Sequence, residues 1–218
     1  DGPTAVTIPE QLLGDLAMAL DAETRDQLVD TVRRFVTERL RPLEAQVAEA
    51  NAVPEPIIAE MRDLGLFGLS IPEAYGGLDL SMEDECLVIF EMGRTSPAFR
   101  SEFGTNVGIG SQGLVMFGND DQKAKWLPGI AAGTTVTSFA LTEPEAGSDS
   151  AAVQTRAILD GDAYVLNGSK RYITNAAKAG LFTVMASSNP DVKGAGGVSA
   201  FLVPSDLPGI TVGPPEKK

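Results

Sequence analysis

Two short stretches hold the residues whose types and spacing could do chemistry. The first reads TSFALTEPEAGSD, from Thr137 to Asp149, and the second reads KRYITN, from Lys170 to Asn175. The first stretch begins as an apolar, β-prone run and then breaks into a loop rich in turn residues. Gly147 lets the backbone of this loop approach a ligand closely, and the hydroxyls of Thr142 and Ser148 add hydrogen-bond donors to the backbone N–H groups. The pattern indicates a loop that holds a planar, electron-accepting ring or a phosphate.

Composition excludes several classes of function. The chain has 218 residues, of which 43% are hydrophobic, so it can bury a sizeable core. Lys and Arg number 17 against 30 Asp and Glu, and the formal net charge of -13 argues against a nucleic-acid-binding surface or a polybasic membrane patch. The chain has no histidine, which excludes a Ser-His-Asp triad, a Cys-His pair and a His-ligated metal within it, and we expect no metal site.

The single cysteine and the hydropathy indicate a cellular compartment. Cys86 cannot form an internal disulfide, and its apolar neighbours predict a small buried side chain. No apolar run approaches the ~18 residues that span a bilayer. The first residues, DGPTAVTIPEQL, lack the basic and apolar regions of a secretory signal. A cytoplasmic location without membrane association is expected.

The first part of the chain is predicted to be helical. Residues 22–50 carry apolar residues at spacings of three and four, which make one buried stripe, and Pro42 is expected to bend or interrupt this helix. The stripe consists of Leu28, Val32, Phe35, Val36 and Leu40.

Four further helices and one long loop complete the predicted helical part. A helix over 55–64 should end at Gly65, and residues 65–81 should form a surface loop of unusual length. Ser81, with Asp84 three residues on, should begin a helix towards Arg94. Another helical stretch, rich in closely packed glycines, is expected over 98–117, and Asp120 is expected to cap the helix that follows.

The sequence changes character at Gly133. A strand is predicted over 134–142, and Asp160-Gly161 and Asn167-Gly168 are two-residue turn signals that favour hairpins. Three antiparallel strands should result, and two apolar runs should lie in the core of a sheet or barrel. The ranges are 153–159, 163–166 and 169–174 for the hairpin strands, and 181–186 and 198–203 for the apolar runs. The expected architecture is α+β, with an all-α helical domain over 1–133 and a β-barrel-like domain over 134–218.

Five motifs in order resemble those of the acyl-CoA dehydrogenase family and cover nearly the whole chain. They are GLFGLSIPEAYGG, FGNDDQKAKWLPGIAAG, FALTEPEAGSD, LNGSKRYITNA and FLVPSDLPGITVG. The Thr-Glu-Pro-x-Ala-Gly-Ser-Asp element is a fairly specific mark of this flavoprotein family, whereas the other pieces support the resemblance only jointly.

The resemblance implies that the two stretches hold the isoalloxazine ring of FAD. Thr142 and Thr174 would be hydroxyl donors, Ser148 would also lie against acyl-CoA, and Tyr172 stands where the family commonly has a tryptophan. Either aromatic can lie against the ring. Glu143 and Glu145 are expected to face solvent or cap a backbone N–H. The implied cofactor contacts are Phe139, Ala140, Leu141, Thr142, Gly147, Ser148, Tyr172, Ile173 and Thr174.

The reaction that the resemblance implies is the FAD-dependent oxidation of an acyl-CoA thioester to the trans-2-enoyl-CoA, a step of fatty acid metabolism. In the family the catalytic glutamate lies in a further helical domain, after the position equivalent to Lys218, so no catalytic base is assigned and this chain is expected to be a truncated, inactive fragment. The implied partners are acyl-CoA, an electron-transfer flavoprotein or similar acceptor, and further copies of the full-length parent in a dimer or tetramer. An acyl-CoA oxidase or flavin monooxygenase of the same superfamily and a catalytically incompetent binding fragment remain alternatives.

Overall fold

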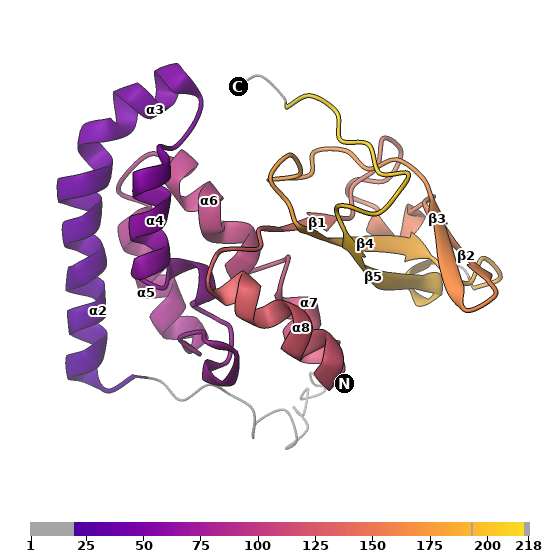
Figure 1. The fold of residues 1–218 in the computed structure, drawn as a ribbon, viewed down its shortest axis with the longest axis horizontal. Helices are drawn as coiled ribbons and strands as arrows, with labels where there is room; N and C mark the ends of the chain where they lie inside the picture. Colours follow the sequence, from indigo (N-terminus) through magenta and orange to yellow (C-terminus); the bar gives the residue numbers. More distant parts are fainter. Residues whose placement is uncertain (1–19, 193, 216–218) are drawn as a thin grey trace, which may run out of the picture.

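The computed structural model describes residues 20–192 and 194–215. Helices gather on one side and strands on the other, as Figure 1 shows. This agrees with the predicted order of a helical part followed by a β part. The first 19 residues, which were included in the predicted helical domain and which bear on the expected lack of a secretory signal, lie outside the described ranges, as does Lys218.

The predicted long helix is present and is interrupted where Pro42 predicts. α2 (Ala22–Phe35) continues into a π-helical turn over Val36–Leu40 and a 3-10 turn over Arg41–Leu43 before α3 (Glu44–Ala50). Val32, Phe35, Val36 and Leu40 of the predicted stripe are buried, and Leu28 packs against them.

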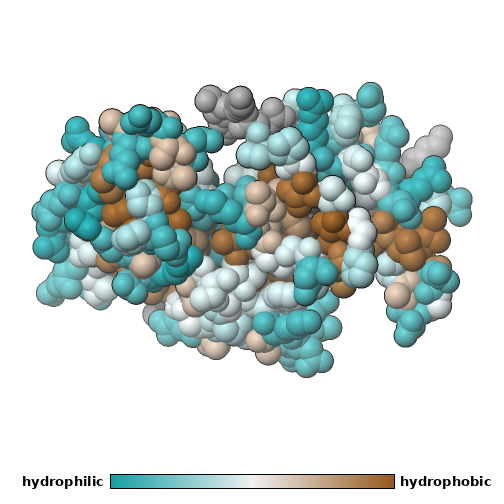
Figure 2. Space-filling model, turned by 45° about the horizontal axis from the view of Figure 1, so that its top comes forward, coloured by the Kyte–Doolittle hydropathy of each residue, from teal (hydrophilic) through white to brown (hydrophobic). Residues whose placement is uncertain are grey.

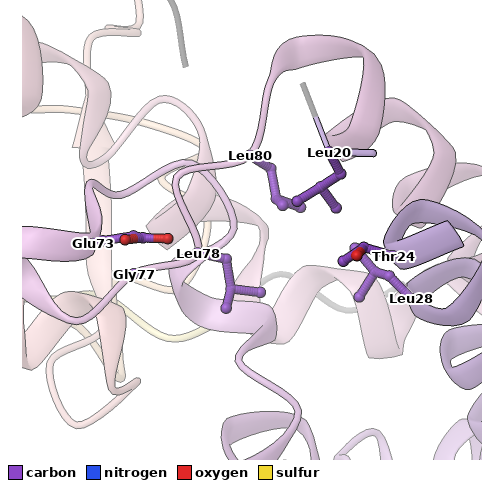
Figure 3. A pocket seen from close by; sticks show the side chains of 7 residues that line it. All are labelled: Leu20, Thr24, Leu28, Glu73, Gly77, Leu78 and Leu80. Carbon is purple, nitrogen blue, oxygen red and sulfur yellow. The ribbon is translucent and has the colours of Figure 1, made fainter. Parts of the chain in front are cut away.

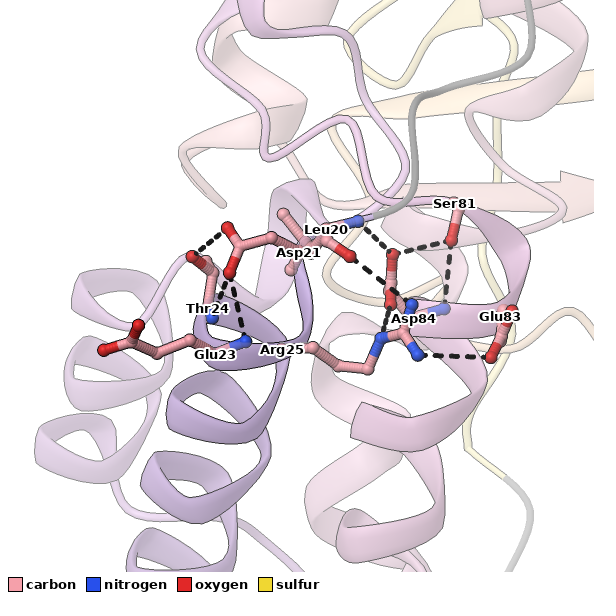
Figure 4. A network of polar contacts seen from close by, with 8 residues as sticks. All are labelled: Leu20, Asp21, Glu23, Thr24, Arg25, Ser81, Glu83 and Asp84. Carbon is pink, nitrogen blue, oxygen red and sulfur yellow. Dashed lines mark hydrogen bonds and ion pairs between the residues drawn. The ribbon is translucent and has the colours of Figure 1, made fainter.

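The start of α2 is tied to the start of α5 (Met82–Met92) through a buried carboxylate (Figure 4). Asp84 accepts hydrogen bonds from the backbone N–H of Leu20 at 3.0 Å and the Ser81 hydroxyl at 2.7 Å, and it pairs with Arg25 Nε at 2.8 Å. Burial raises the pKa of the Asp84 carboxyl, but these hydrogen bonds and the Arg25 charge outweigh burial and lower the pKa below its ordinary value. The Ser81 hydroxyl also caps α5, as the sequence predicts.

The prediction of a surface loop between α4 (Glu55–Asp63) and α5 is wrong, because this segment packs into the core. It contains 3-10 turns at Leu66–Gly68 and Glu73–Tyr75, and its apolar side chains are buried. A Cβ on Gly77 would overlap the Ile71 carbonyl, so the backbone at Gly77 packs directly against the backbone at Ile71. Apolar side chains pull the segment into the core. The buried ones are Leu66, Phe67, Leu69, Ile71 and Leu80.

The remaining helices differ from prediction in three details. The stretch over 98–117 is two helices, α6 (Pro97–Val107) and α7 (Gln112–Phe117), because residues 108–111 form a turn that interrupts the helix. Asn119, rather than Asp120, caps α8 (Asp120–Ala131), since its side chain accepts from Gln122 N–H in a reciprocal capping box. Cys86 is exposed rather than buried, because it lies on the outer face of α5.

The strands form a five-stranded mixed sheet. β4 (Leu181–Ser187) pairs parallel with β1 (Thr137–Ala140), antiparallel with β5 (Val198–Pro204) and, at its end, parallel with β2 (Arg156–Asp160). Asp160-Gly161 makes the predicted hairpin from β2 to β3 (Ala163–Asn167).

The second predicted hairpin is wrong. Residues 169–175 are not a strand, because Tyr172 and Asn175 have positive φ angles of 59° and 63°. A Cβ on Gly168 would clash with Thr155, so this glycine serves a close backbone approach rather than a two-residue turn. The chain instead crosses from β3 to the end of β1.

A shared core joins the helices to the sheet. Leu127 and Ile130 of α8 are buried with Leu114 of α7 and Leu181 of β4. Trp126 is half-buried beside them. These contacts attach the start of β4 to the helices.

Candidate functional site

β1 delivers the loop that the sequence singles out. β1 ends at Ala140, and the chain then turns over Pro144 and Glu145, with Glu143 N–H donating to the Ala146 carbonyl at 3.0 Å. The predicted strand is therefore only four residues long, from Thr137 to Ala140. The residues beyond it are loop, as the turn-rich sequence predicts.

The structure brings the two predicted stretches side by side. Arg171 N–H donates to the Thr142 carbonyl at 2.8 Å, and the Ser138 hydroxyl donates to the Thr174 carbonyl at 2.7 Å. Although these contacts join residues up to 36 positions apart in sequence, the loop and the 170–175 segment form one continuous surface.

The predicted contact residues line this surface to different degrees. Gly147, Ser148, Tyr172 and Thr174 are exposed, and Tyr172 shows 66% of its surface. The others lie lower in the wall: Phe139, Leu141, Thr142 and Ile173 are half-buried, and Ala140 is buried.

The residues present fit a planar cofactor with an electron-rich edge. Within the described ranges, the hydroxyls of Thr142, Ser148 and Thr174 make no hydrogen bond to another residue, so they are free to donate to a ligand. A Cβ built on Gly147 would meet no atom within 4 Å, which leaves open space in front of the backbone at that point. The exposed ring of Tyr172 supplies an aromatic surface, with the Arg171 guanidinium 4.7 Å from its centre.

Helix α6 holds the 170–175 segment in place. The Asn175 side-chain amide donates to the Ser101 carbonyl at 2.8 Å and to the Thr105 hydroxyl at 3.0 Å. Asn175 adopts a left-handed backbone conformation, which asparagine tolerates better than most residues. The position of the segment therefore depends on the helical part of the chain.

A buried ion pair lies beneath the loop. Lys170 Nζ is 2.7 Å from Glu143 Oε1, and these side chains are 12% and 4% exposed. Glu143 also accepts from the backbone N–H groups of Gln154 at 2.7 Å and Thr155 at 2.9 Å, and from the Thr155 hydroxyl. The expectation that Glu143 caps a backbone N–H is confirmed, whereas the alternative that it faces solvent is wrong; Glu145 is exposed.

These contacts keep Glu143 ionised. Burial raises the pKa of its carboxyl, but hydrogen bonds from Lys170, from the Thr155 hydroxyl and from two backbone N–H groups outweigh burial and lower the pKa from 4.5 to about 2. A carboxylate with this pKa is a weak base, and its oxygens are already occupied. Glu143 is therefore structural and does not serve as a proton acceptor.

Three residues that shape this surface lie in the two stretches but received no role from the sequence: Ser138, Lys170 and Asn175. Each acts through a partner distant in the chain, and its local sequence gives no periodic or turn signal that identifies the partner. Lys170 is part of a polar run, Lys170-Arg171, in which a solvated charge would be the ordinary expectation.

Two hollows lie elsewhere, on the helical part. One, of about 440 Å³, is lined by seven residues at the start of α2 and in the segment before α5 (Figure 3). The other, of about 700 Å³, lies along α5 and includes the exposed Cys86 and Phe90. Neither hollow contains a predicted contact residue.

Apolar side chains are also exposed in patches, which Figure 2 shows in brown on both parts of the molecule. Phe90 and Phe117 on the helices and Ile158 and Leu159 on β2 are among the exposed ones. Throughout the described residues, no group of His, Cys, Asp and Glu side chains is arranged to hold a metal ion. None of the helices described is both long and apolar enough to cross a membrane.

Comparison with known proteins identifies both parts of the chain. Residues 22–134 match the family described as acyl-CoA dehydrogenase, N-terminal domain, and residues 138–218 match acyl-CoA dehydrogenase, middle domain. The probable acyl-CoA dehydrogenase FadE25 of Mycobacterium tuberculosis is 39% identical over 196 residues, which are 90% of this chain and 50% of that protein. The chain thus spans about half the length of the curated relatives it matches.

Two solved structures extend the comparison. An acyl-CoA dehydrogenase complexed with FAD from Bacillus anthracis has a TM-score of 0.79 at 32% identity, with 94% of this chain and 35% of that chain covered. The prolyl acyl carrier protein oxidase AnaB has a TM-score of 0.82 at 28% identity, with 92% and 52% covered.

Proposed function

The chain belongs to the acyl-CoA dehydrogenase family, and from this membership we propose that the protein containing it oxidises an acyl-CoA thioester to the trans-2-enoyl-CoA with FAD as the electron acceptor. The observation that carries this proposal is the pairing of the Thr142–Ser148 loop with Tyr172 and Thr174 on one surface, where three hydroxyls remain free to donate. FAD, when bound, supplies the hydride acceptor.

The proposed role of the residues in this chain is to bind and orient the flavin ring and the acyl-CoA. The free hydroxyls of Thr142 and Thr174 would donate to the edge of the ring that gathers negative charge, and fixed donors there favour the reduced form. Tyr172 would lie against the ring, and Gly147 would leave room for it. Phe139, Ala140, Leu141 and Ile173 would complete the wall, and Ser148 would also contact acyl-CoA.

Proton removal is assigned to no residue of this chain. The α-proton of a thioester is only modestly acidic, so a carboxylate base is required. Glu143 is unsuited because its pKa is about 2 and its oxygens are engaged. We propose that the base comes from outside these 218 residues.

Three further features belong to the proposal. The helical domain ends at residue 133 and the β domain begins at residue 134. The working protein is a cytoplasmic homo-oligomer. It passes electrons to an electron-transfer flavoprotein or similar acceptor.

The proposal is tested with the full-length, FAD-loaded protein under anaerobic conditions. Addition of acyl-CoAs of increasing chain length should bleach the visible flavin absorption for at least one of them and yield the enoyl-CoA. A loaded protein that leaves every acyl-CoA unchanged would contradict the proposed reaction.

Two alternatives have specific support. The similarity to a prolyl acyl carrier protein oxidase favours an oxidase, in which the reduced flavin reacts with oxygen. Rapid reoxidation by air after substrate reduction would identify that reaction. Because no residue of this chain is assigned as the base, a catalytically incompetent binding fragment is the second alternative, and turnover by the 218-residue chain alone would refute it.

The open space at Gly147 gives a test of the cofactor position. Gly147→Leu places a side chain where the free protein has no atom within 4 Å, so folding should be unaffected while the affinity for FAD falls at least about tenfold. Gly113→Leu is the matched control, because Gly113 in α7 also faces open space. Titration with FAD, followed by fluorescence quenching, measures the FAD affinity of both variants. Equal affinities in the two variants would place the ring elsewhere.

A further inference from the structure

Three consecutive residues of the loop are each bonded to Lys170 or its neighbour. Lys170 Nζ donates to the Leu141 carbonyl at 3.0 Å, Arg171 N–H donates to the Thr142 carbonyl at 2.8 Å, and Lys170 Nζ pairs with Glu143 at 2.7 Å. Thr142, a proposed donor to the cofactor, therefore lies between two residues that one ammonium group holds.

The same pair ties the loop to the rest of the sheet. Lys170 Nζ donates its third hydrogen bond to the Met185 carbonyl of β4 at 2.6 Å. Glu143 bonds the backbone N–H groups of Gln154 and Thr155, where the loop returns to enter β2. Leu141, where the chain leaves β1, residues 154 and 155, where it returns to β2, and Met185 of β4 are thus all bonded to the Glu143–Lys170 pair.

Burial makes this geometry strict. An exposed ion pair contributes little and holds its side chains loosely, whereas a buried pair needs every donor and acceptor satisfied. Here the ammonium has three acceptors, and both carboxylate oxygens have donors. Neither charge is left to act directly on a ligand.

We propose that the Glu143–Lys170 pair positions the cofactor-facing loop, fixing the Thr142 donor relative to the Tyr172–Thr174 segment so that both meet the same ring. This inference rests on the proposed flavin function and adds two positioning residues to it. It makes neither of them catalytic, since both act through the backbone they hold.

The test uses the full-length protein reconstituted with FAD. Lys170→Met removes the ammonium while keeping most of the side-chain bulk, and it should weaken FAD binding at least tenfold. At saturating FAD, the reduction potential of the bound flavin should become more negative, because displaced donors stabilise the reduced ring less. A role confined to stability would not change the potential of the fully loaded protein.

Two further variants separate positioning from general damage. Glu143→Gln keeps the shape and removes the charge, so it should shift affinity and potential in the same direction even where Lys170→Met fails to fold. The double variant should bind FAD more tightly than Lys170→Met alone, because it no longer buries an unpaired carboxylate.

Lys178→Met is the matched control. Lys178 forms an ion pair with Glu102 at 2.8 Å, but its side chain is 52% exposed, and its removal should leave affinity within about twofold. If Lys170→Met and Glu143→Gln bind FAD as tightly as the unmodified protein and at the same potential, or if Lys178→Met weakens binding equally, the positioning role is wrong. An unmodified protein that binds no FAD would instead overturn the proposed function, and the inference with it.

Discussion

Asn106→Leu is expected to lower the free energy of unfolding by about 3 to 5 kcal/mol, since each buried polar group left without a partner costs about 1–3 kcal/mol. Asn106 is fully buried in α6, and its amide donates to the Ile130 carbonyl at 3.0 Å and the Thr135 carbonyl at 2.8 Å. Its side-chain oxygen accepts from Thr137 N–H at 2.9 Å. Leucine fills a similar volume, so the Thr137 N–H and the Thr135 carbonyl would lose this partner, while the Ile130 carbonyl would still accept from Gly133 N–H at 3.1 Å.

The loss should also extend to the site, because Asn106 fixes both the end of α8 and the start of β1. Chemical denaturation monitored by Trp126 fluorescence gives the free energy of unfolding. Asn167→Leu, at an exposed asparagine in β3, is the matched control and should change stability by less than about 0.5 kcal/mol. A similar small change for Asn106→Leu would show that solvent or neighbouring groups replace its hydrogen bonds.

The second large effect is acid destabilisation through Glu143. Its pKa is about 2 in the folded protein and about 4.5 when unfolded, so its contribution is fully present above pH 4.5 and is lost as the pH falls towards 2. A difference of this size corresponds to at most about 3 kcal/mol, at 1.36 kcal/mol per pKa unit. The sign follows because protonation is easier in the unfolded chain.

Glu143→Gln removes this titration. The stability difference between the unmodified protein and this variant should be largest near neutral pH and should shrink as the pH falls through the window from about 4.5 to 2. Urea denaturation at several pH values measures it. Glu145→Gln, which neutralises an exposed carboxyl in the same loop, should change the curve little. A difference that is constant with pH would contradict the assigned ion pair.

The two predictions concern the two ends of strand β1. Asn106 joins α6 and α8 to the start of β1, and Glu143 with Lys170 holds the loop at the end of β1. Asn175 then connects α6 to the segment beside the loop. Although the loop and this segment are exposed, buried polar contacts therefore set their positions at both ends of the strand.

Local signals in the sequence determined much of this protein. The spacing of Val32, Phe35 and Leu40 predicts a buried helical face, Ser81 predicts a helix start, and Asp160-Gly161 predicts a hairpin, and all of these are confirmed. The family motifs predict membership, which is confirmed as well. Each of these signals is carried by neighbouring residues, so each can be recognised without knowledge of the fold.

The tertiary structure alone decided where the local signals fail or compete. Asn167-Gly168 has the composition of a hairpin turn, but contact with Thr155 uses its glycine for close packing, and residues 169–175 cross to β1 instead. The TEPEAGSD loop resembles a free-standing donor loop in sequence. In the fold, its first carboxylate is buried against a lysine 27 positions away, because only the folded chain brings these two charges together and removes them from water.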